Sequence, residues 1–243
     1  ALQIRANHYQ MTYYLLLLLL VFGVVQLWQH YKSNALVDLS KKVSVLAAAG
    51  ILALGLNATA LMATSEYTKF STRGKSELTF SATAEPVEIR SGLSYDYITQ
   101  FSYGIFESLN LIAPRIQGGG SREDLGTSSE VYEYLIKQGA SRQQAKGFSE
   151  NVPTYWGDQP ILEAPAYVGV VVVFLALLAL FLGWNTHKRW LFFGILLSLT
   201  LSWGKNFSFL TQFFIDYVPM YNKFRAVSSI QVLLELAFPV LAS

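Results

Sequence analysis

Eight residues, all in polar segments beside long apolar runs, have side chains suited to binding a phosphate group or a sugar. Basic side chains donate charged hydrogen bonds to phosphate oxygens, and a histidine changes its protonation state near neutral pH. Aromatic rings beside an aspartate are a common composition for a sugar contact. These candidate binding residues are Arg5, His8, Tyr155, Trp156, Asp158, Lys205, Lys223 and Arg225.

The basic candidates each have a second interpretation that the residues alone leave open. Arg5 and His8 lie directly before the first apolar run, where they would contact either lipid headgroups or a specific anion. Lys205 interrupts an apolar run, where an ionisable residue is costly unless it faces protein or water. It marks either a broken helix whose free backbone groups meet a ligand or a short span from which it snorkels. Lys223 and Arg225 alternate with aromatic residues and fit either a phosphate on a lipid or sugar, or an anionic-lipid anchor.

The candidate sugar contacts lie together in the segment 153–160, just before an apolar run. Tyr155 and Trp156 are followed closely by Asp158. Asp158 is compatible with a general base, a metal ligand or a turn residue, and the sequence favours the turn. An ordinary interfacial loop would have the same composition.

The composition excludes several other kinds of site. The chain has no cysteine, which rules out disulfides and cysteine-based metal sites or nucleophiles. Its three histidines, His8, His30 and His187, lie in different segments, so we predict no metal site. The net charge of +2 is too small to indicate nucleic-acid binding. No catalytic residue and no cofactor can be assigned, although a divalent cation is compatible with the chemistry.

Long apolar runs predict that membrane helices position these residues. The chain is 52% hydrophobic and 14% charged, against about 25% charged in a typical soluble domain. Runs at 11–28 and 43–64 would form helices of about 27 and 33 Å, close to the ~30 Å hydrocarbon core. A third run covers 166–184, and a fourth begins at Trp190 and is interrupted at 204–206.

We therefore expect an all-α polytopic transmembrane protein with four spans, a truncated fifth and a large mixed outer loop. The run 230–242 is too short to cross a membrane and is the expected start of the fifth span. Because the chain begins without methionine and ends inside an apolar run, we expect an internal fragment of a longer protein.

The charge distribution divides the chain into three regions. Residues 1–64 hold spans one and two, and 166–243 hold spans three and four, an interfacial segment and the start of span five. The region 65–165 carries 9 Lys/Arg against 13 Asp/Glu, and it is too long to be a mere connector. Within it we expect short β-type stretches at 78–80 and 87–89, an interfacial helix at 98–111 and a helix at 129–139.

Basic residues near the ends of the spans predict the orientation in the membrane. Lys32, Lys41 and Lys42 lie between spans one and two, and Lys188 and Arg189 lie between spans three and four. If both loops are cytoplasmic, the number of spans places 5–10, 65–165 and 204–229 outside. All eight candidate residues then lie on the outer side.

Four stretches of the chain resemble the YfhO family of bacterial polytopic membrane proteins. They are LQIRANHYQMTYY (2–14), SYGIFESLNLIAPRIQGG (102–119), PTYWGDQP (153–160) and WGKNFSFLTQFFIDYVPMYNKFR (203–225). Together they spread the resemblance over nearly the whole chain. The family is similar to GT-C glycosyltransferases, multi-span enzymes that transfer a sugar from a polyprenyl-phosphate donor on the outer face of the membrane.

This resemblance implies a bacterial inner-membrane glycosyltransferase that modifies an envelope glycopolymer or protein. The basic candidates would neutralise the donor phosphate as the leaving group develops charge, and the 153–160 segment would contact the sugar or the acceptor. GT-C enzymes typically carry the catalytic carboxylate in the first outer loop, which we expect to lie outside this fragment. A transporter or flippase of lipid-linked saccharides would use the same groups by alternating access, and a membrane scaffold would bind an envelope partner through 65–165.

Overall fold

The computed structural model describes residues 1–74 and 92–243, and the fold of these residues is helical. The described residues contain no strand beyond one isolated bridge between Glu123 and Val152, so the predicted all-α class is confirmed. The helices are α1 (Leu2–Arg5), α2 (Tyr9–Lys32), α3 (Leu36–Gly55), α4 (Ala58–Thr68), α5 (Tyr95–Ile98), η1 (Phe106–Leu111), α6 (Glu130–Lys137), α7 (Arg142–Ser149), α8 (Val170–Leu182), α9 (Thr186–Ser202), η2 (Gly204–Phe207), α10 (Ser208–Tyr217), η3 (Tyr221–Lys223), η4 (Val227–Gln231) and α11 (Val232–Ala242).

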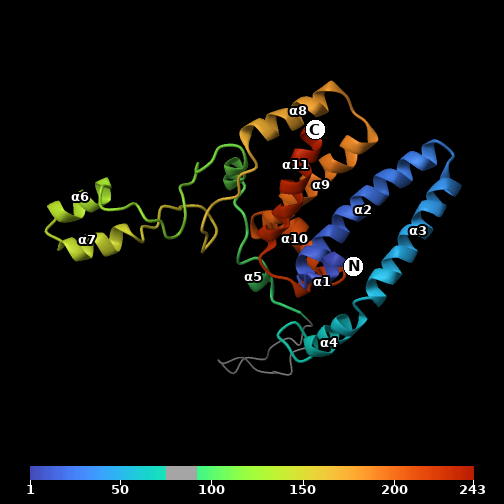
Figure 1. The fold of residues 1–243 in the computed structure, drawn as a ribbon, viewed down its shortest axis with the longest axis horizontal. Helices are drawn as coiled ribbons and strands as arrows, with labels where there is room; N and C mark the ends of the chain where they lie inside the picture. Colours follow the sequence, from blue (N-terminus) through green and yellow to red (C-terminus); the bar gives the residue numbers. More distant parts are fainter. Residues whose placement is uncertain (75–91) are drawn as a thin grey trace.

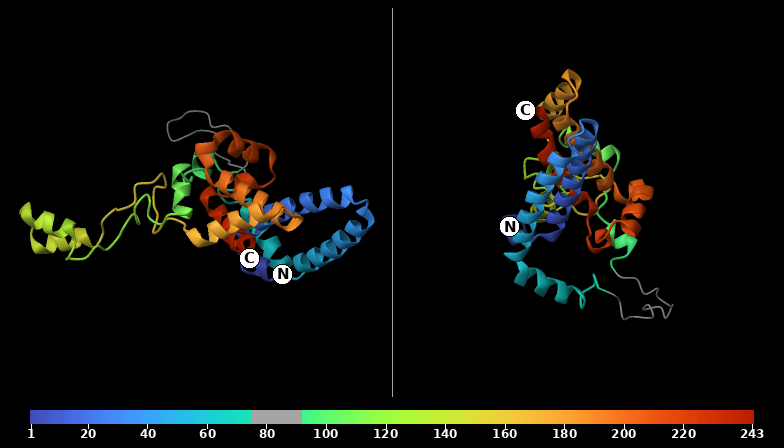
Figure 2. Two further views of the ribbon diagram at one scale, coloured as in Figure 1. Left: turned by 90° about the horizontal axis from the view of Figure 1, so that it is seen from above. Right: turned by 90° about the vertical axis from the view of Figure 1, so that its right-hand side faces the viewer.

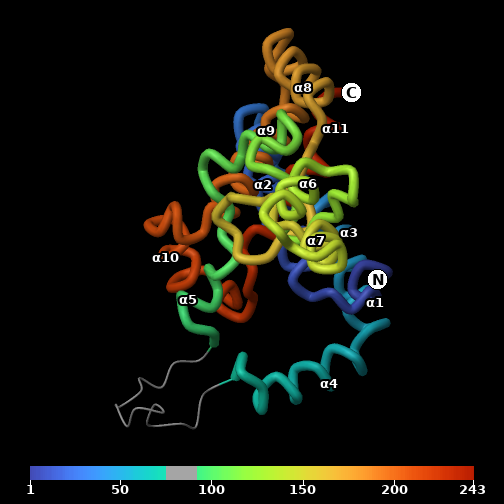
Figure 3. The backbone as a smooth tube through the Cα atoms, turned by 90° about the vertical axis from the view of Figure 1, so that its left-hand side faces the viewer, coloured from blue at the N-terminus to red at the C-terminus, as the bar shows by residue number. Residues whose placement is uncertain are grey.

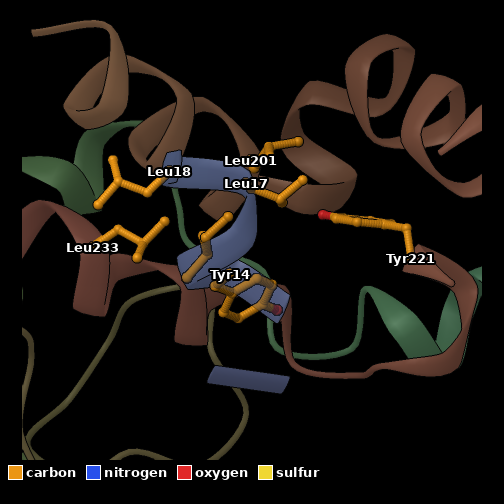
Figure 4. Packing of buried hydrophobic residues seen from close by; sticks show 7 residues of the cluster. Tyr14, Leu17, Leu18, Leu201, Tyr221 and Leu233 are labelled. Carbon is orange, nitrogen blue, oxygen red and sulfur yellow. The ribbon is translucent and has the colours of Figure 1, made fainter. Parts of the chain in front are cut away.

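A bundle of α2, α8, α9 and α11 forms the centre of the molecule (Figure 1). Figure 4 shows the cluster of buried residues that joins α2 to α9, η4 and α11: Tyr14, Leu17, Leu18, Leu201, Tyr221, Ile230 and Leu233. A second cluster joins α8, α9 and α11 and includes Ala176 and Ala237, whose small side chains let these helices approach closely.

The lengths of the helices support fewer membrane crossings than the apolar runs predict. Within the described residues, α2 is long and apolar enough to cross a membrane, and α3 with α4 forms a second crossing if this pair, bent by 71°, is one span. The helices α8, α9 and α11 have 13, 17 and 11 residues. These lengths correspond to about 20, 26 and 17 Å, short of a core of about 30 Å.

The break between α3 and α4 falls at Leu56 and Asn57. The Asn57 amide donates a hydrogen bond of 2.8 Å back to the carbonyl of Ala53, one turn earlier. Such a local bond competes with the regular backbone ladder of a helix. The predicted second span is therefore two helices rather than one.

The region 65–165 differs from its prediction at several places. The expected helix at 129–139 is confirmed as α6, which with α7 forms a hairpin that projects away from the bundle (Figures 1 and 2). The expected helix at 98–111 is wrong, because the chain forms only α5 and η1 there. Between them the Tyr103 amide donates to the Ser202 carbonyl at 2.8 Å, pairing with the end of α9 instead of its own helix. The β-type stretches 78–80 and 87–89 lie outside the described residues.

The three segments predicted to share one side of a membrane meet at one end of the bundle. Tyr9, at the start of α2, is hydrogen-bonded to Thr64 of α4 at 3.1 Å. Gln10 donates to the carbonyl of Arg225 at 2.6 Å. At the other end, Trp28 of α2 and Trp184 of the α8–α9 loop line one groove.

Candidate functional site

A stretch without regular structure, residues 99–105, crosses the end of α9 together with η1 and organises the candidate site. Ser102 accepts a hydrogen bond from the break after α9, Phe101 accepts one from the chain after η3, and Gly104 lies against Asp158 of the 153–160 loop. Three of the four sequence stretches that carry the family resemblance therefore meet here. We call the residues Gly104, Glu107, Tyr155, Asp158 and Asn206 the polar cluster.

Glu107 is a fully buried carboxylate at the centre of the polar cluster. One oxygen accepts hydrogen bonds from the Tyr155 hydroxyl and from the Gln159 amide, the latter at 3.1 Å. The other oxygen accepts from the Gly104 amide at 2.7 Å. A buried carboxylate needs such donors, and together they hold the 153–160 loop against η1. Burial, and the bond to Glu107, raise the pKa of Tyr155, so this phenol stays protonated as a donor.

Asp158 places a second, exposed carboxylate beside the first. Its Oδ2 accepts a hydrogen bond of 3.2 Å from the Asn206 amide, which also donates to the Tyr103 carbonyl at 2.9 Å. A Cβ atom on Gly104 would lie 2.8 Å from this oxygen and 3.2 Å from Glu107 Oε2. The two carboxylates therefore lie within about 6 Å of each other, and a side chain at position 104 would displace the Asp158 carboxylate.

The predicted break in the fourth apolar run is confirmed, and its backbone groups are paired. The chain turns at Gly204, whose φ of +48° favours glycine, and continues as η2 and α10. The Lys205 amide donates to Ser102 Oγ at 2.9 Å, and the Gly204 carbonyl accepts from Thr211 Oγ1 at 2.9 Å. The hypothesis that the break leaves these groups free for a ligand is wrong, while the Lys205 side chain is exposed.

Arg225 approaches the same segment from the chain after η3. Its guanidinium lies 4.6 Å from the centre of the Tyr97 ring and 5.3 Å from that of Phe101. Nη1 donates to the Tyr97 hydroxyl at 2.7 Å. None of the carboxylates in the described parts of the chain forms an ion pair with it. The aromatic rings hold this cation in place without neutralising it.

The remaining candidates lie apart from the polar cluster. His8 accepts a hydrogen bond from the Met11 amide at 3.4 Å and so caps α2, and Arg5 ends α1 in an exposed position. Lys223 donates to the Arg73 carbonyl at 2.9 Å, and burial lowers its pKa. Trp156 is 69% exposed. The structure thus brings together Tyr155 and Asp158, with Lys205 adjacent in sequence to Asn206 and Arg225 against the same 99–105 segment. The other four candidates, Arg5, His8, Trp156 and Lys223, lie outside the polar cluster.

The glycine run 118–120 packs closely against the 153–160 loop and the residues that follow it. A Cβ on Gly118, which has a φ of +83°, would collide with the carbonyl of Thr154, and one on Gly120 would collide with that of Glu163. The run is therefore a packing surface rather than a phosphate-binding loop, as its sequence also indicates.

A shallow cleft of about 530 Å³ lies between α5 and α10 and is lined by aromatic side chains together with an acid and an amide. Figure 3 shows these two helices on the same side of the molecule. Gln212 donates to both oxygens of Asp216 at 2.9 Å, next to Phe213 and Tyr217, whose ring centres are 5.3 Å apart. Aromatic faces beside such polar groups suit a sugar or another small polar ligand.

Three members of the polar cluster, Gly104, Glu107 and Asn206, are not among the eight candidate residues predicted from the sequence. Glu107 had a usable signal, because it is the only charged residue between Asp96 and Arg115, in a stretch rich in apolar and aromatic residues. A lone carboxylate in such surroundings needs a partner. In residues 1–74 and 92–243 no three histidine, aspartate or glutamate side chains gather as metal ligands.

Comparisons of the chain with models of protein families, with curated proteins and with solved structures found no match. The resemblance to the YfhO family therefore stays a prediction.

Proposed function

We propose that the chain is part of an integral membrane glycosyltransferase that takes its sugar from a polyprenyl-phosphate donor on the outer face of a bacterial inner membrane. The acceptor would be an envelope glycopolymer or protein. The observation that carries this proposal is the meeting of Asp158, Glu107 and Tyr155 beside Lys205 at one end of an apolar helical bundle. Acidic, aromatic and basic groups at a membrane surface fit a sugar linked to a lipid phosphate.

The exposure of the apolar helices supports a place in the membrane. Only 17% of the most apolar stretch of α2 is buried, whereas a core helix of a water-soluble protein is mostly covered. On α3, Val45 and Ile51 are 72% and 69% exposed, and on α8 Phe181 is 89% exposed. Contiguous apolar surface of this extent requires lipid or a protein partner.

In the proposed reaction, an acceptor hydroxyl attacks the anomeric carbon of the donor sugar. A new bond forms between the acceptor oxygen and this carbon, and the bond from the carbon to the phosphate oxygen breaks. Lys205 and Arg225 would stabilise the charge that develops on the departing lipid phosphate. Asp158 would take the proton of the acceptor hydroxyl or hold the acceptor in place. The buried Glu107 would position Asp158 through the 153–160 loop.

The kinetics of the Asp158→Asn variant show whether Asp158 takes the proton of the acceptor hydroxyl or only holds the acceptor in place. General-base catalysis contributes about 10²- to 10⁴-fold to a rate, so Asp158→Asn would lower kcat by that factor if Asp158 takes the proton. If the base lies in another loop, as GT-C enzymes suggest, the same substitution would mainly raise the KM for the acceptor.

The proposal is tested by mass spectrometry of envelope glycans from cells with and without the full-length protein. We expect a glycan to be lost without the protein, and to be restored by the wild type but reduced in Lys205→Ala and Arg225→Ala variants that still insert. Lys137→Ala, whose side chain is 76% exposed on the projecting hairpin, is the control and should restore the glycan fully. Unchanged glycans in cells without the protein would refute the transferase proposal.

A transporter of lipid-linked saccharides is the second candidate, since α9 and α10 form a broken helix. In such transporters the backbone groups of the break bind the cargo, whereas here those of Gly204 and Lys205 are paired with Thr211 and Ser102. Accumulation of lipid-linked sugars on the inner face in cells without the protein would favour this candidate.

A further inference from the structure

An apolar groove runs along α2 and α9, and the part of it lined by Trp28, Trp184 and Arg189 lies at the opposite end of the bundle from the polar cluster. Its volume is about 790 Å³, within the usual range for a site that binds a small molecule. Every side chain that lines it is apolar or aromatic except Arg189. The lining residues are Leu17, Leu20, Val21, Val24, Val25, Trp28, Trp184, Arg189, Phe193, Leu197, Phe214 and Val218.

Arg189 is a cation without a counter-ion in this groove. Its Nε atom is buried and has no hydrogen-bond partner, and none of the carboxylates in residues 1–74 and 92–243 forms an ion pair with it. The neighbouring Lys188 is engaged elsewhere, because it donates to the Ala179 carbonyl at the end of α8. An unpaired cation in apolar surroundings is costly, so a bound anion would satisfy Arg189.

The surroundings of Arg189 show which kind of anion fits. Trp28 and Trp184 line this end of the groove, and tryptophan favours the boundary between membrane and water. Lys32 lies 4.9 Å above the Trp28 ring and adds a second positive charge there. The two cations match the anionic headgroup of a lipid, and the apolar groove beside them matches its hydrocarbon chains.

We propose that this groove binds an anionic glycerophospholipid of the bilayer, with its phosphate on Arg189 and its acyl chains along α2 and α9. This inference rests on the membrane location in the proposed function, but not on transferase activity. The sugar donor would be a different molecule. Its phosphate would lie near Lys205, beyond the end of α9, and about 20 Å of α9 separates Arg189 from that end at Ser202.

The test measures lipid binding to the delipidated full-length protein in mild detergent by native mass spectrometry. The probes are phosphatidylglycerol, which is anionic, and phosphatidylcholine, which is zwitterionic. We expect phosphatidylglycerol to bind more tightly, and Arg189→Gln to weaken it about five-fold, the effect of one charge near a membrane surface. Binding of phosphatidylcholine should not change. Arg142→Gln, an exposed position on the projecting hairpin, should leave both affinities unchanged.

A second variant keeps the test decisive if Arg189→Gln fails to fold. Val24→Trp fills the groove without changing its charge, and it should reduce the binding of both lipids. Equal affinity of the wild type for the two lipids would overturn the proposal, and so would unchanged affinity in Val24→Trp. The proposal would also be overturned if the protein retained only polyprenyl phosphate or only detergent. Envelope glycans measured with the same variants tell the two proposals apart. If the wild-type protein binds both lipids equally while the glycan still depends on the protein, only the groove proposal is refuted. If lipid binding is selective but glycans are unchanged without the protein, only the transferase proposal is refuted.

Discussion

At the scale of single residues, Glu107 is the group on which the geometry of the site depends most. Its carboxylate accepts hydrogen bonds from Tyr155, Gln159 and Gly104, and its side chain is fully buried. Glu107→Ala would leave these donors without an acceptor, at a cost of about 1–3 kcal/mol for each buried group left unpaired. We expect a clearly lower free energy of unfolding, measured by denaturant titration in detergent.

Two other variants control this prediction. Glu107→Gln retains one acceptor oxygen and should be less destabilising than Glu107→Ala. Glu133→Ala removes an exposed carboxylate in a surface pair with Lys137 and should change the stability by less than about 0.5 kcal/mol. Equal stability of Glu107→Ala and Glu133→Ala would contradict the central position of Glu107.

At the scale of elements, the turn after α9 brings η2 against the 99–105 segment. Gly204 has a positive φ, and a Cβ there would collide with Ser102 Oγ. Gly204→Ala should therefore destabilise the protein by more than about 1 kcal/mol and weaken the placement of Asn206 against Asp158. Thermal unfolding measures the effect. Gly147→Ala, where a Cβ meets nothing within 4 Å, is the control and should be no less stable than the wild type, since alanine favours the helix α7.

The connection between the bundle and the α6–α7 hairpin should depend on pH. Glu123 accepts from Thr154 and pairs with Arg115 at 2.7 Å, and these contacts, in that order, lower the pKa of Glu123 below 4.5. A lowered pKa in the folded state stabilises the fold above pH 4.5, and this contribution is lost as pH falls through the folded value. The paired amides of Glu123 and Val152 should therefore lose hydrogen-exchange protection in acid.

This loss of protection is measured after correction for the intrinsic pH dependence of exchange. In Glu123→Gln the protection should be weaker at neutral pH and should change little on acidification. A fall of equal size in the variant and the wild type would show that another group is responsible.

The elements also show what the sequence could and could not predict. The spacing of apolar residues located α2 and α6, and the charge at Lys205 located the break after α9. The 99–105 segment was missed because its backbone pairs with the end of α9, a contact between residues distant in sequence. Local patterns carry no information about such partners. Of the five residues of the polar cluster, the sequence therefore predicted only Tyr155 and Asp158.

At the scale of the whole molecule, the two ends of the helical bundle carry different kinds of side chains. One end holds the polar cluster and Arg225, and the other holds Arg189 and Lys32 beside tryptophan. The two ends would lie on opposite sides of a membrane, since a lipid-linked donor would be used at the first and a bilayer lipid would bind at the second. The exposed apolar faces of α2, α3 and α8 would then contact lipid.

The most direct test of this arrangement is cysteine labelling in intact cells, since the chain has no cysteine of its own. Pro160→Cys lies beside the polar cluster, and His187→Cys lies at the opposite end; both positions are exposed. With a membrane-impermeant maleimide, we predict labelling of Pro160→Cys in intact cells and of His187→Cys only after permeabilisation. Labelling of both variants in intact cells, or of His187→Cys alone, would contradict the outward position of the site.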